Sequence, residues 1–431
     1  MSTGVALAVP GTLIEPERFA FGDLLQLGDR VVCGQVCAEP LTLTRRLVAE
    51  CTQRELSLQV FVGTLFSDTF ERAPETMRFL SYGAIGRASR IADRRALDVL
   101  PERYSRLPQL FACGSLTADV VLLQAALGPD GTLSFGLASD YAIDAARKAR
   151  TVVVEVNPMA PYTHGTPWPV DLPVHAWVRA EHAPLELAPV SMGEVEQTIA
   201  AHVAALIPDG ATVQVGVGAL PDAALAALKN HRALGLHSGV LGDAGVRLIN
   251  AGVIDNSRKG CDAGVSVTNT ICGSAASYAF VDRNAAIELR HSDATHGVEP
   301  LSRLSRFHSI NGALEVDLSG QVNCEQLHGR PRGGVGGLLD FARAARASSD
   351  GRALTVLPAT AAGGTESRIV ASLGGPATIG RADVDVVVTE YGVADLRNVS
   401  LSERARRLIA IAAPQFRERL ESAQRSMDVS Q

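Results

Sequence analysis

Aromatic residues and excess charge are both scarce in this sequence. Phe, Tyr and Trp make up 5% of the 431 residues, charged residues make up 20%, and the net charge at pH 7 is −6. Proteins that bind nucleic acids normally carry a basic face or stripe, which this composition does not provide. We therefore expect no nucleic-acid partner, and a polyanionic ligand would need a local site on this protein.

Long apolar runs are also missing. The chain begins "MSTGVALAVPGTLIEPERF", where no basic segment precedes the apolar residues and Pro10 and Gly11 interrupt them. A signal peptide needs a basic start and an uninterrupted apolar stretch, and a membrane-spanning helix needs about 20 apolar residues. The sequence therefore predicts a cytoplasmic protein with no membrane partner.

Cysteine is sparse as well. The seven cysteines are an odd number and are spread thinly, which is typical of a reducing compartment and not of a disulfide framework. Cys33 and Cys37 lie four residues apart, but no second cluster of Cys or His completes a metal site. We expect two small buried thiols there and no bound metal.

The residues that are abundant favour an α/β protein whose two halves are alike. Gly and small apolar residues abound, and segments 29–51 and 210–230 both read as an apolar strand, a turn with Ala-x-Pro, and an amphipathic helix. Pro40 and Pro221 correspond, and proline is tolerated near a helix start because its missing N–H is not needed there. The repeated pattern predicts crossover helices and parallel strands.

The halves also end alike, with β-branched strands in 146–161 and in 379–396. Clear helices are predicted at 140–149, 192–206 and 401–411. The sequence therefore predicts two similar α/β domains with mainly parallel sheets, an N-terminal domain over 1–188 and a C-terminal domain over 189–431 that carries the site loops. Ligands of such folds bind at the carboxyl ends of the strands.

Three glycine-rich stretches follow or precede strands, at 215–221, 330–345 and 357–370. Glycine lets backbone N–H groups approach a ligand and point at negative charge. For any one stretch alone, a tight turn is the better interpretation. The "GVGG" after Arg332 is not a nucleotide-binding P-loop, because no Gly-Lys-Ser/Thr follows it.

Long collinear segments carry a family resemblance. They are "LINAGVIDNSRKG", "SINGALEVDLSGQV", "GGVGGLLDFARAA", "LPATAAGGTESRIV" and "VDVVVTEYGVADL", with a weaker match at "LSFGLASDYAIDAARKARTVVVEVNPMAP" in the first half. Together they resemble the acetyl-CoA hydrolase/transferase family, which includes 4-hydroxybutyrate and acetate/butyrate CoA-transferases. The resemblance implies the class I CoA-transferase fold, a coenzyme A thioester as substrate, no covalently bound cofactor, and a homo-oligomer such as a homodimer.

The same resemblance implies a departure at the reacting centre. In the family, the loop similar to "LGLHSGVLGDAG" (234–245) carries a glutamate that attacks the acyl-CoA thioester and becomes a glutamyl-CoA. Here that position is Gly239. Two neighbouring family positions also differ, since an Asn that orients the carboxylate is replaced by His296, and a Gln after "GVGG" is replaced by Leu338.

The candidate residues form a catalytic group and a substrate-binding group. The candidate catalytic positions are Gly239, His296 and Glu366, and the candidate substrate-binding or coenzyme A-binding residues are Gly216, Val217, Gly218, His237, Ser238, Gly334, Val335, Gly336 and Gly337. The loop 334–337 is favoured as the backbone site for the thioester oxygen. Loop 216–218 fits a ligand site and a structural turn equally well. His237 and Ser238 are better interpreted as structural support, and Glu366 is better interpreted as a solvent-exposed residue. For His296, a role as general base and a role as a hydrogen-bonded loop histidine are equally good interpretations.

Three functions follow from these patterns. The first is an enzyme that hydrolyses an acyl-CoA thioester, or performs another reaction without CoA transfer, because the family nucleophile is missing. The second is the family-type transfer of CoA from an acyl-CoA to a carboxylate. The third is a protein that binds acyl-CoA without catalysis.

Overall fold

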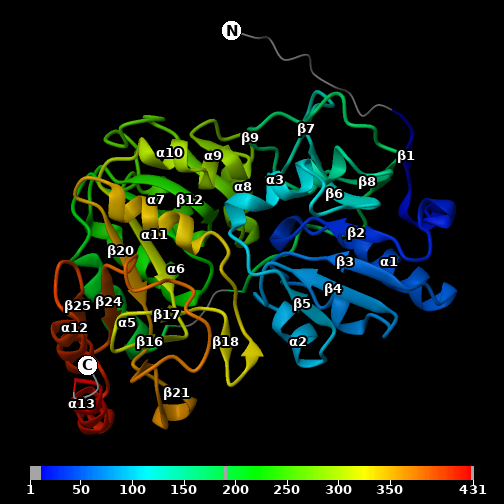
Figure 1. Ribbon diagram of the computed structural model, residues 1–431. Coiled ribbons are helices and arrows are strands. Elements are labelled where there is room, and N and C mark those ends of the chain that lie inside the picture. Colours follow the sequence, from blue (N-terminus) through cyan, green and yellow to red (C-terminus); the bar gives the residue numbers. More distant parts are fainter. Residues whose placement is uncertain (1–10, 189–191, 429–431) are drawn as a thin grey trace. The chain divides into compact units, whose positions relative to one another are not determined.

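The computed structural model describes residues 11–188 and 192–428, and these form two units (Figure 1). Unit 1 contains the described part of Met1–Ala188 together with Val267–Thr295, and unit 2 contains the described parts of Pro189–Ser266 and His296–Gln431. Val267–Thr295 therefore belongs to unit 1, although it lies within the predicted C-terminal domain 189–431. Its strand Ile287–Leu289 pairs with His164–Gly165, which explains this assignment. Residues 1–10, on which part of the signal-peptide prediction depends, lie outside the described part.

The main sheet of unit 1 is parallel except at one short strand. Its strand order is β1-β10-β8-β6-β2-β3-β4-β5, and β7 pairs antiparallel with β6. Buried β-branched residues build its centre, because both faces of a parallel sheet are covered. The strands of unit 1 are β1 (Leu13–Ile14), β2 (Arg30–Cys33), β3 (Leu58–Phe61), β4 (Met77–Ser81), β5 (Leu97–Val99), β6 (Val120–Leu127), β7 (Leu133–Ser134), β8 (Thr151–Asn157), β9 (His164–Gly165), β10 (Ala176–Arg179), β13 (Ser266–Ile271) and β14 (Ile287–Leu289).

Helices connect the strands of unit 1. They are α1 (Leu41–Arg54), α2 (Ala88–Asp93), α3 (Leu107–Ala112), α4 (Ala142–Ala146) and α8 (Ala275–Val281), and α9 (Ser292–His296) ends at the first residue of unit 2's second segment. Short 3₁₀ helices lie at Pro16–Arg18, Gly22–Leu24, Val36–Ala38, Thr69–Arg72 and Tyr104–Arg106. Pro40 directly precedes α1, as the sequence predicts.

A buried carboxyl group ties β8 to the start of α1. Glu155 Oε2 accepts hydrogen bonds from the backbone N–H groups of Thr42 (2.8 Å) and Leu43 (3.2 Å). Glu155 Oε1 and Gln124 Oε1, on paired positions of β8 and β6, have no hydrogen-bond partner among the described residues. Burial raises the pKa of Glu155 to about 7.

Unit 2 repeats the strand order of unit 1. Its main strands follow the order β25-β24-β20-β15-β11-β12, and neighbouring strands are parallel except for β24 with β25. The order β24-β20-β15-β11-β12 matches β10-β8-β6-β2-β3, which confirms the predicted α/β class with two similar halves. The strands are β11 (Thr212–Val215), β12 (Gly235–Leu241), β15 (Phe307–Gly312), β20 (Arg352–Val356), β24 (Val386–Thr389) and β25 (Gly392–Asp395).

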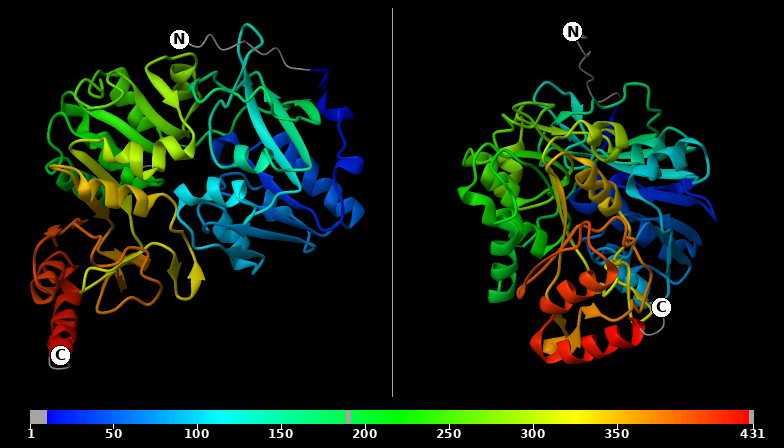
Figure 2. Two further views of the ribbon diagram at one scale, coloured as in Figure 1. Left: turned by 45° about the horizontal axis from the view of Figure 1, so that its top comes forward. Right: turned by 60° about the vertical axis from the view of Figure 1, so that its left-hand side comes forward.

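The helices of unit 2 pack on this sheet or on one another, with α6 against β11 and β15, α11 against β15 and β20, and α13 against α12 (Figure 1). They are α5 (Glu194–Ala204), α6 (Ala219–Ala226), α7 (Asp243–Asn250), α10 (Val298–Ser302), α11 (Leu338–Ala347), α12 (Leu401–Ala410) and α13 (Pro414–Asp428), with 3₁₀ helices at Ala227–Asn230 and Ala362–Gly364. The helices predicted at 140–149, 192–206 and 401–411 correspond to α4, α5 and α12. Figure 2 shows α12 and α13, in red, lying side by side near the C-terminus.

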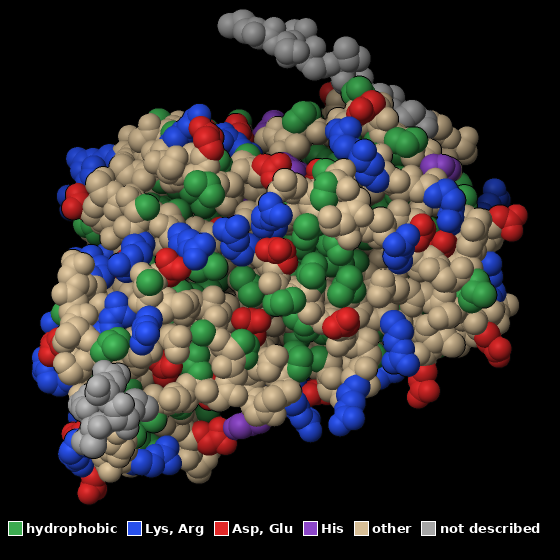
Figure 3. All heavy atoms as spheres, in the orientation of Figure 1, with side chains coloured by type: hydrophobic (Ala, Val, Ile, Leu, Met, Phe, Trp, Pro, Cys, Tyr) green, Lys and Arg blue, Asp and Glu red, His purple; other side chains and the backbone are tan. Residues whose placement is uncertain are grey.

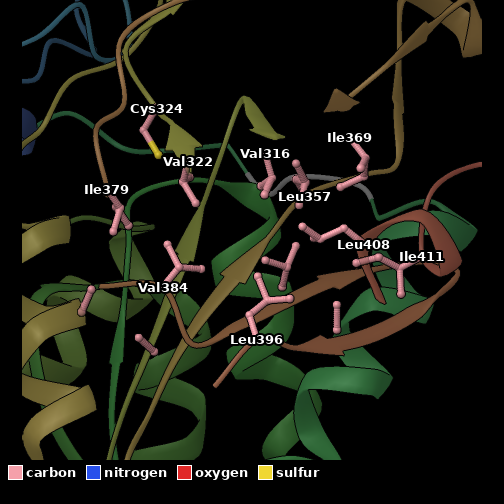
Figure 4. Close-up of a cluster of buried hydrophobic side chains, with 14 of the residues drawn as sticks. Val316, Val322, Cys324, Leu357, Ile369, Ile379, Val384, Leu396, Leu408 and Ile411 are labelled. Carbon is pink, nitrogen blue, oxygen red and sulfur yellow. The ribbon is translucent and has the colours of Figure 1, made fainter. Parts of the chain in front are cut away.

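Unit 2 also contains short strands outside the main sheet. They are β16 (Glu315–Asp317), β17 (Val322–Asn323), β18 (Gln326–Leu327), β19 (Arg330–Pro331), β21 (Thr360–Ala361), β22 (Glu366–Ser367) and β23 (Ile369–Val370). The strands β17, β16 and β23 form one small sheet, and its buried side chains pack with Leu396, Leu408 and Ile411 in a shared core (Figure 4). This core anchors the C-terminal helices to the rest of unit 2.

The surface is mixed in charge. On the face drawn in Figure 3, Lys and Arg side chains are interspersed with Asp and Glu side chains. Among the described residues, no helix combines the length and apolar character needed to cross a membrane.

Candidate active site

The carboxyl ends of β11 and β12 position the predicted loops in unit 2. His237 and Ser238 are buried on β12 and precede Gly239. The Ser238 hydroxyl accepts a hydrogen bond from the Val215 N–H (3.2 Å) and donates one to the Val215 carbonyl (3.1 Å). Ser238 therefore ties β12 to β11, which favours the structural interpretation over a serine nucleophile.

Gly216 has a packing reason to be glycine. A Cβ at this position would lie 2.6 Å from Asn311 Oδ1. The Asn311 amide is fixed in turn by two hydrogen bonds with Gln214 on the neighbouring strand, of 3.1 and 3.0 Å. The next two residues, Val217 and Gly218, are exposed, and Gly218 immediately precedes α6 with a φ of 137° that disfavours other residues. Pro221 lies in the first turn of that helix.

The space beside Gly239 is filled by the imidazole of His296. A Cβ at position 239 would lie 2.8 Å from His296 Nε2 and 3.2 Å from His296 Cε1. His296 ends α9 and is only 4% exposed. A side chain at position 239 therefore requires the His296 ring to move, because real Cβ atoms essentially never lie within 3.0 Å of another atom.

A second glycine borders the same ring. A Cβ at Gly337 would lie 2.6 Å from His296 Cδ2 and 2.7 Å from His296 Nε2. The imidazole thus touches the Cα sides of Gly239 and Gly337, with Nε2 close to both. Phe341 contacts it as well, with 4.7 Å between the two ring centroids. Nε2 is the ring atom that lies next to both Gly239 and Gly337.

The loop 334–337 leads directly into α11, which starts at Leu338 as the sequence predicts. Gly336 is buried with a φ of 49°, and a Cβ built there would meet no atom within 4 Å. The first N–H groups of a helix have no acceptor within the helix and carry positive partial charge. The loop therefore combines a backbone conformation suited to glycine, open space beside Gly336, and a helix start that favours a negative oxygen.

Glu366 is placed elsewhere. It lies half-exposed on β22, and its Oε2 is 3.6 Å from Nε2 of His328. This contact joins β22 to the turn between β18 and β19, and both side chains are exposed, which favours the solvent-exposed interpretation of Glu366 over a displaced nucleophile.

The site contains two features that the sequence did not reveal. Phe341 was not singled out from the sequence, and Gly337 was treated only as part of a loop that holds an oxygen. Both border His296 in the structure. The spacing of four residues between Gly337 and Phe341 could have predicted that they lie on one face of a helix start.

This arrangement is suited to acyl-group chemistry. A neutral imidazole accepts a proton from water at neutral pH, and backbone N–H groups at a helix start stabilise an oxyanion. Burial of the imidazole limits the bulk water around it, which strengthens both effects.

Comparison with known proteins covers both units. The acetyl-CoA hydrolase/transferase N-terminal domain matches residues 13–174, and the acetyl-CoA hydrolase/transferase C-terminal domain matches residues 273–424. A 4-hydroxybutyrate coenzyme A transferase of Clostridium kluyveri is 38% identical over 399 residues, which is 91% of this chain and 92% of the relative.

Two solved structures resemble the whole chain. RipA from Yersinia pestis is 31% identical with a TM-score of 0.87, and the alignment covers 94% of this chain and 95% of RipA. A 4-hydroxybutyrate CoA-transferase from Porphyromonas gingivalis is 34% identical with a TM-score of 0.77, with 94% and 95% of the two chains covered.

Proposed function

Because the chain belongs to the acetyl-CoA hydrolase/transferase family, we propose that it hydrolyses an acyl-CoA thioester, with water in place of an enzyme carboxylate as the attacking group. The observation that carries this proposal is the contact between Gly239 and His296. The family resemblance puts the nucleophilic glutamate at position 239, where this chain has no side chain. The imidazole of His296 occupies the adjoining space, 2.8 Å from the Cβ position.

The roles of the residues follow from their positions. His296 Nε2 removes a proton from a water molecule as that water attacks the thioester carbonyl carbon. The backbone of Gly334, Val335, Gly336 and Gly337 holds the developing oxyanion. The carbon–sulfur bond then breaks, and the imidazolium returns its proton to the departing CoA sulfur. The products are a carboxylic acid and free CoA.

The proposal also covers the substrate, the assembly and the partners of the protein. Coenzyme A thioester is the substrate, no cofactor is bound covalently, and the loop 216–218 helps to hold the substrate at the start of α6. The protein acts as a homo-oligomer in the cytoplasm, and it binds neither nucleic acid nor membrane.

Transfer of CoA to a carboxylate is the second candidate. It is favoured by the C. kluyveri relative, whose name is that of a CoA transferase and which covers most of this chain. Transfer of the family type needs a covalent acyl carrier at position 239, and a side chain there would require the His296 ring to move. A protein that binds acyl-CoA without turnover is the remaining candidate.

The test is release of CoA from a panel of acyl-CoAs, with and without acetate. Hydrolysis predicts free CoA and no dependence on acetate. General acid–base catalysis contributes about 10²- to 10⁴-fold, so His296→Gln should lower kcat by about 100-fold or more. A matched control is His308→Gln, because His308 is equally buried and its Nδ1 contacts the Arg306 carbonyl oxygen at 2.9 Å.

Each outcome selects one candidate. Acetate-dependent formation of acetyl-CoA without free CoA would replace hydrolysis by transfer. Tight acyl-CoA binding with no turnover under either condition would establish the non-catalytic binder.

A further inference from the structure

The imidazole of His296 is bordered by two glycines and one aromatic ring. On two sides it meets glycines, Gly239 and Gly337, which have no side-chain atoms to hold it. The terminal torsion of a histidine side chain is broad, so its neighbours decide which orientation the ring takes. The aromatic ring of Phe341 contacts this imidazole, and its centroid lies 4.7 Å away at an interplanar angle of 49°.

Phe341 is itself firmly held. It is 2% exposed and belongs to the main core of unit 2. Its Cε2 atom would lie 3.4 Å from a Cβ at Gly239 and 3.2 Å from a Cβ at Gly337, so the ring edge reaches both glycines. Its backbone N–H donates to the Gly337 carbonyl at 3.2 Å. Phe341 therefore links the imidazole, the glycine loop and the core.

We propose that Phe341 is a positioning residue that fixes the His296 imidazole with Nε2 at the two glycines. The separation of 4.7 Å lies in the range in which aromatic rings attract each other. Since Phe341 stands one turn after Gly337, the same helix start that presents the loop 334–337 also presents the ring that holds the base. The relative position of base and oxyanion site is thereby set by one rigid element.

The catalytic part of this inference rests on the proposed function, whereas the orientation of the ring is measurable without turnover. The test variant is Phe341→Leu, which removes the aromatic face and keeps an apolar side chain. The control is Phe70→Leu, because Phe70 is equally buried, lies in the core of unit 1 and packs its ring on Phe79 at 5.5 Å.

Two measurements are made on each variant. The first is kcat and KM for acyl-CoA hydrolysis, together with the melting temperature. Misplacement of a catalytic group by about 1 Å costs on the order of 100-fold in rate. We expect kcat of Phe341→Leu to fall about tenfold or more with KM changed less than about twofold, and Phe70→Leu to keep both values within about twofold.

The second measurement is the imidazole NMR signal of His296 in protein labelled at histidine Cε1, assigned by its loss in His296→Gln. The wild type and Phe70→Leu should show one signal shifted by the neighbouring aromatic ring. Phe341→Leu should lose that shift and show a broadened or multiple signal.

The outcomes separate the two proposals. An unchanged His296 signal in folded Phe341→Leu overturns the positioning role, whatever the rate. A changed signal with unchanged kcat also overturns it, because the orientation would then not serve turnover. If the wild type hydrolyses no acyl-CoA, the proposed function fails, and the NMR signal alone decides whether Phe341 orients the ring.

Discussion

The substitution Gly239→Ala adds a single methyl group at the centre of the proposed site. The new Cβ would lie 2.8 Å from His296 Nε2, whereas ordinary contacts begin at 3.4 Å. The ring must therefore move by about 3.4 − 2.8 = 0.6 Å. It moves against the backbone of Gly337 or the ring of Phe341, both of which already border it.

The expected effect on rate follows from this displacement. A misplacement of about 1 Å costs on the order of 100-fold, so a shift of about 0.6 Å predicts a loss of about tenfold in kcat. The effect on stability should be small, because Ala restricts the unfolded chain more than Gly does and offsets part of the crowding.

The assay is steady-state hydrolysis of acyl-CoA, with the melting temperature of each variant measured in parallel. Gly312→Ala is the control, because Gly312 also lies in a strand and a Cβ there would meet no atom within 4 Å. It should keep the wild-type kcat. A kcat of Gly239→Ala within about twofold of the wild type would refute the reasoning, because the imidazole would then not be needed in this place.

Three further predictions test other parts of the account. Gly239→Glu alone should give no strong acetate-dependent CoA transfer, because the His296 ring blocks the new carboxylate. Gly239→Glu combined with His296→Asn should give measurable transfer. Equal activity of the two proteins would contradict the blocking contact. Gly336→Val should weaken acyl-CoA binding in calorimetry, because a β-branched residue is strained at a φ of 49° and its side chain would fill the open space beside the loop, and unchanged binding in a folded variant would make the loop only a turn. The raised pKa of Glu155, about 7 against an ordinary 4.5, means that the folded state holds this proton more tightly, so its contribution to stability is complete below pH 4.5 and is lost as the pH rises through 7. Over that window, denaturant titrations should show a loss of roughly 3 kcal/mol in the free energy of unfolding that is absent in Glu155→Gln. An equal dependence on pH in both proteins would rule out this assignment.

Much of the fold could be predicted because its elements are locally encoded. The β-branched run 151–157 and the run at 386–389 are strands, and α11 begins at Leu338, directly after the glycines. In these segments, side-chain burial and backbone preference point to the same structure. The assignment of Val267–Thr295 to unit 1 was not predictable in this way, because it depends on pairing between strands that are distant in sequence.

The site was predictable only in part. Gly239 and His296 were singled out in the sequence as expected departures from the pattern of the family that it resembles. Their contact was not, because it depends on how β12, the end of α9 and the start of α11 meet in three dimensions. The role of Glu155 was hidden for the same reason, since its partner Thr42 lies 113 residues away along the chain.

The most direct test of the central claim is the origin of the oxygen in the product. Acyl-CoA is incubated with the protein in ¹⁸O-labelled water, with and without acetate, and the released carboxylic acid is weighed by mass spectrometry. Attack by water predicts one ¹⁸O atom per acid formed in a single turnover, an equal amount of free CoA, and no effect of acetate. Formation of acetyl-CoA in the presence of acetate, without free CoA, would contradict the account.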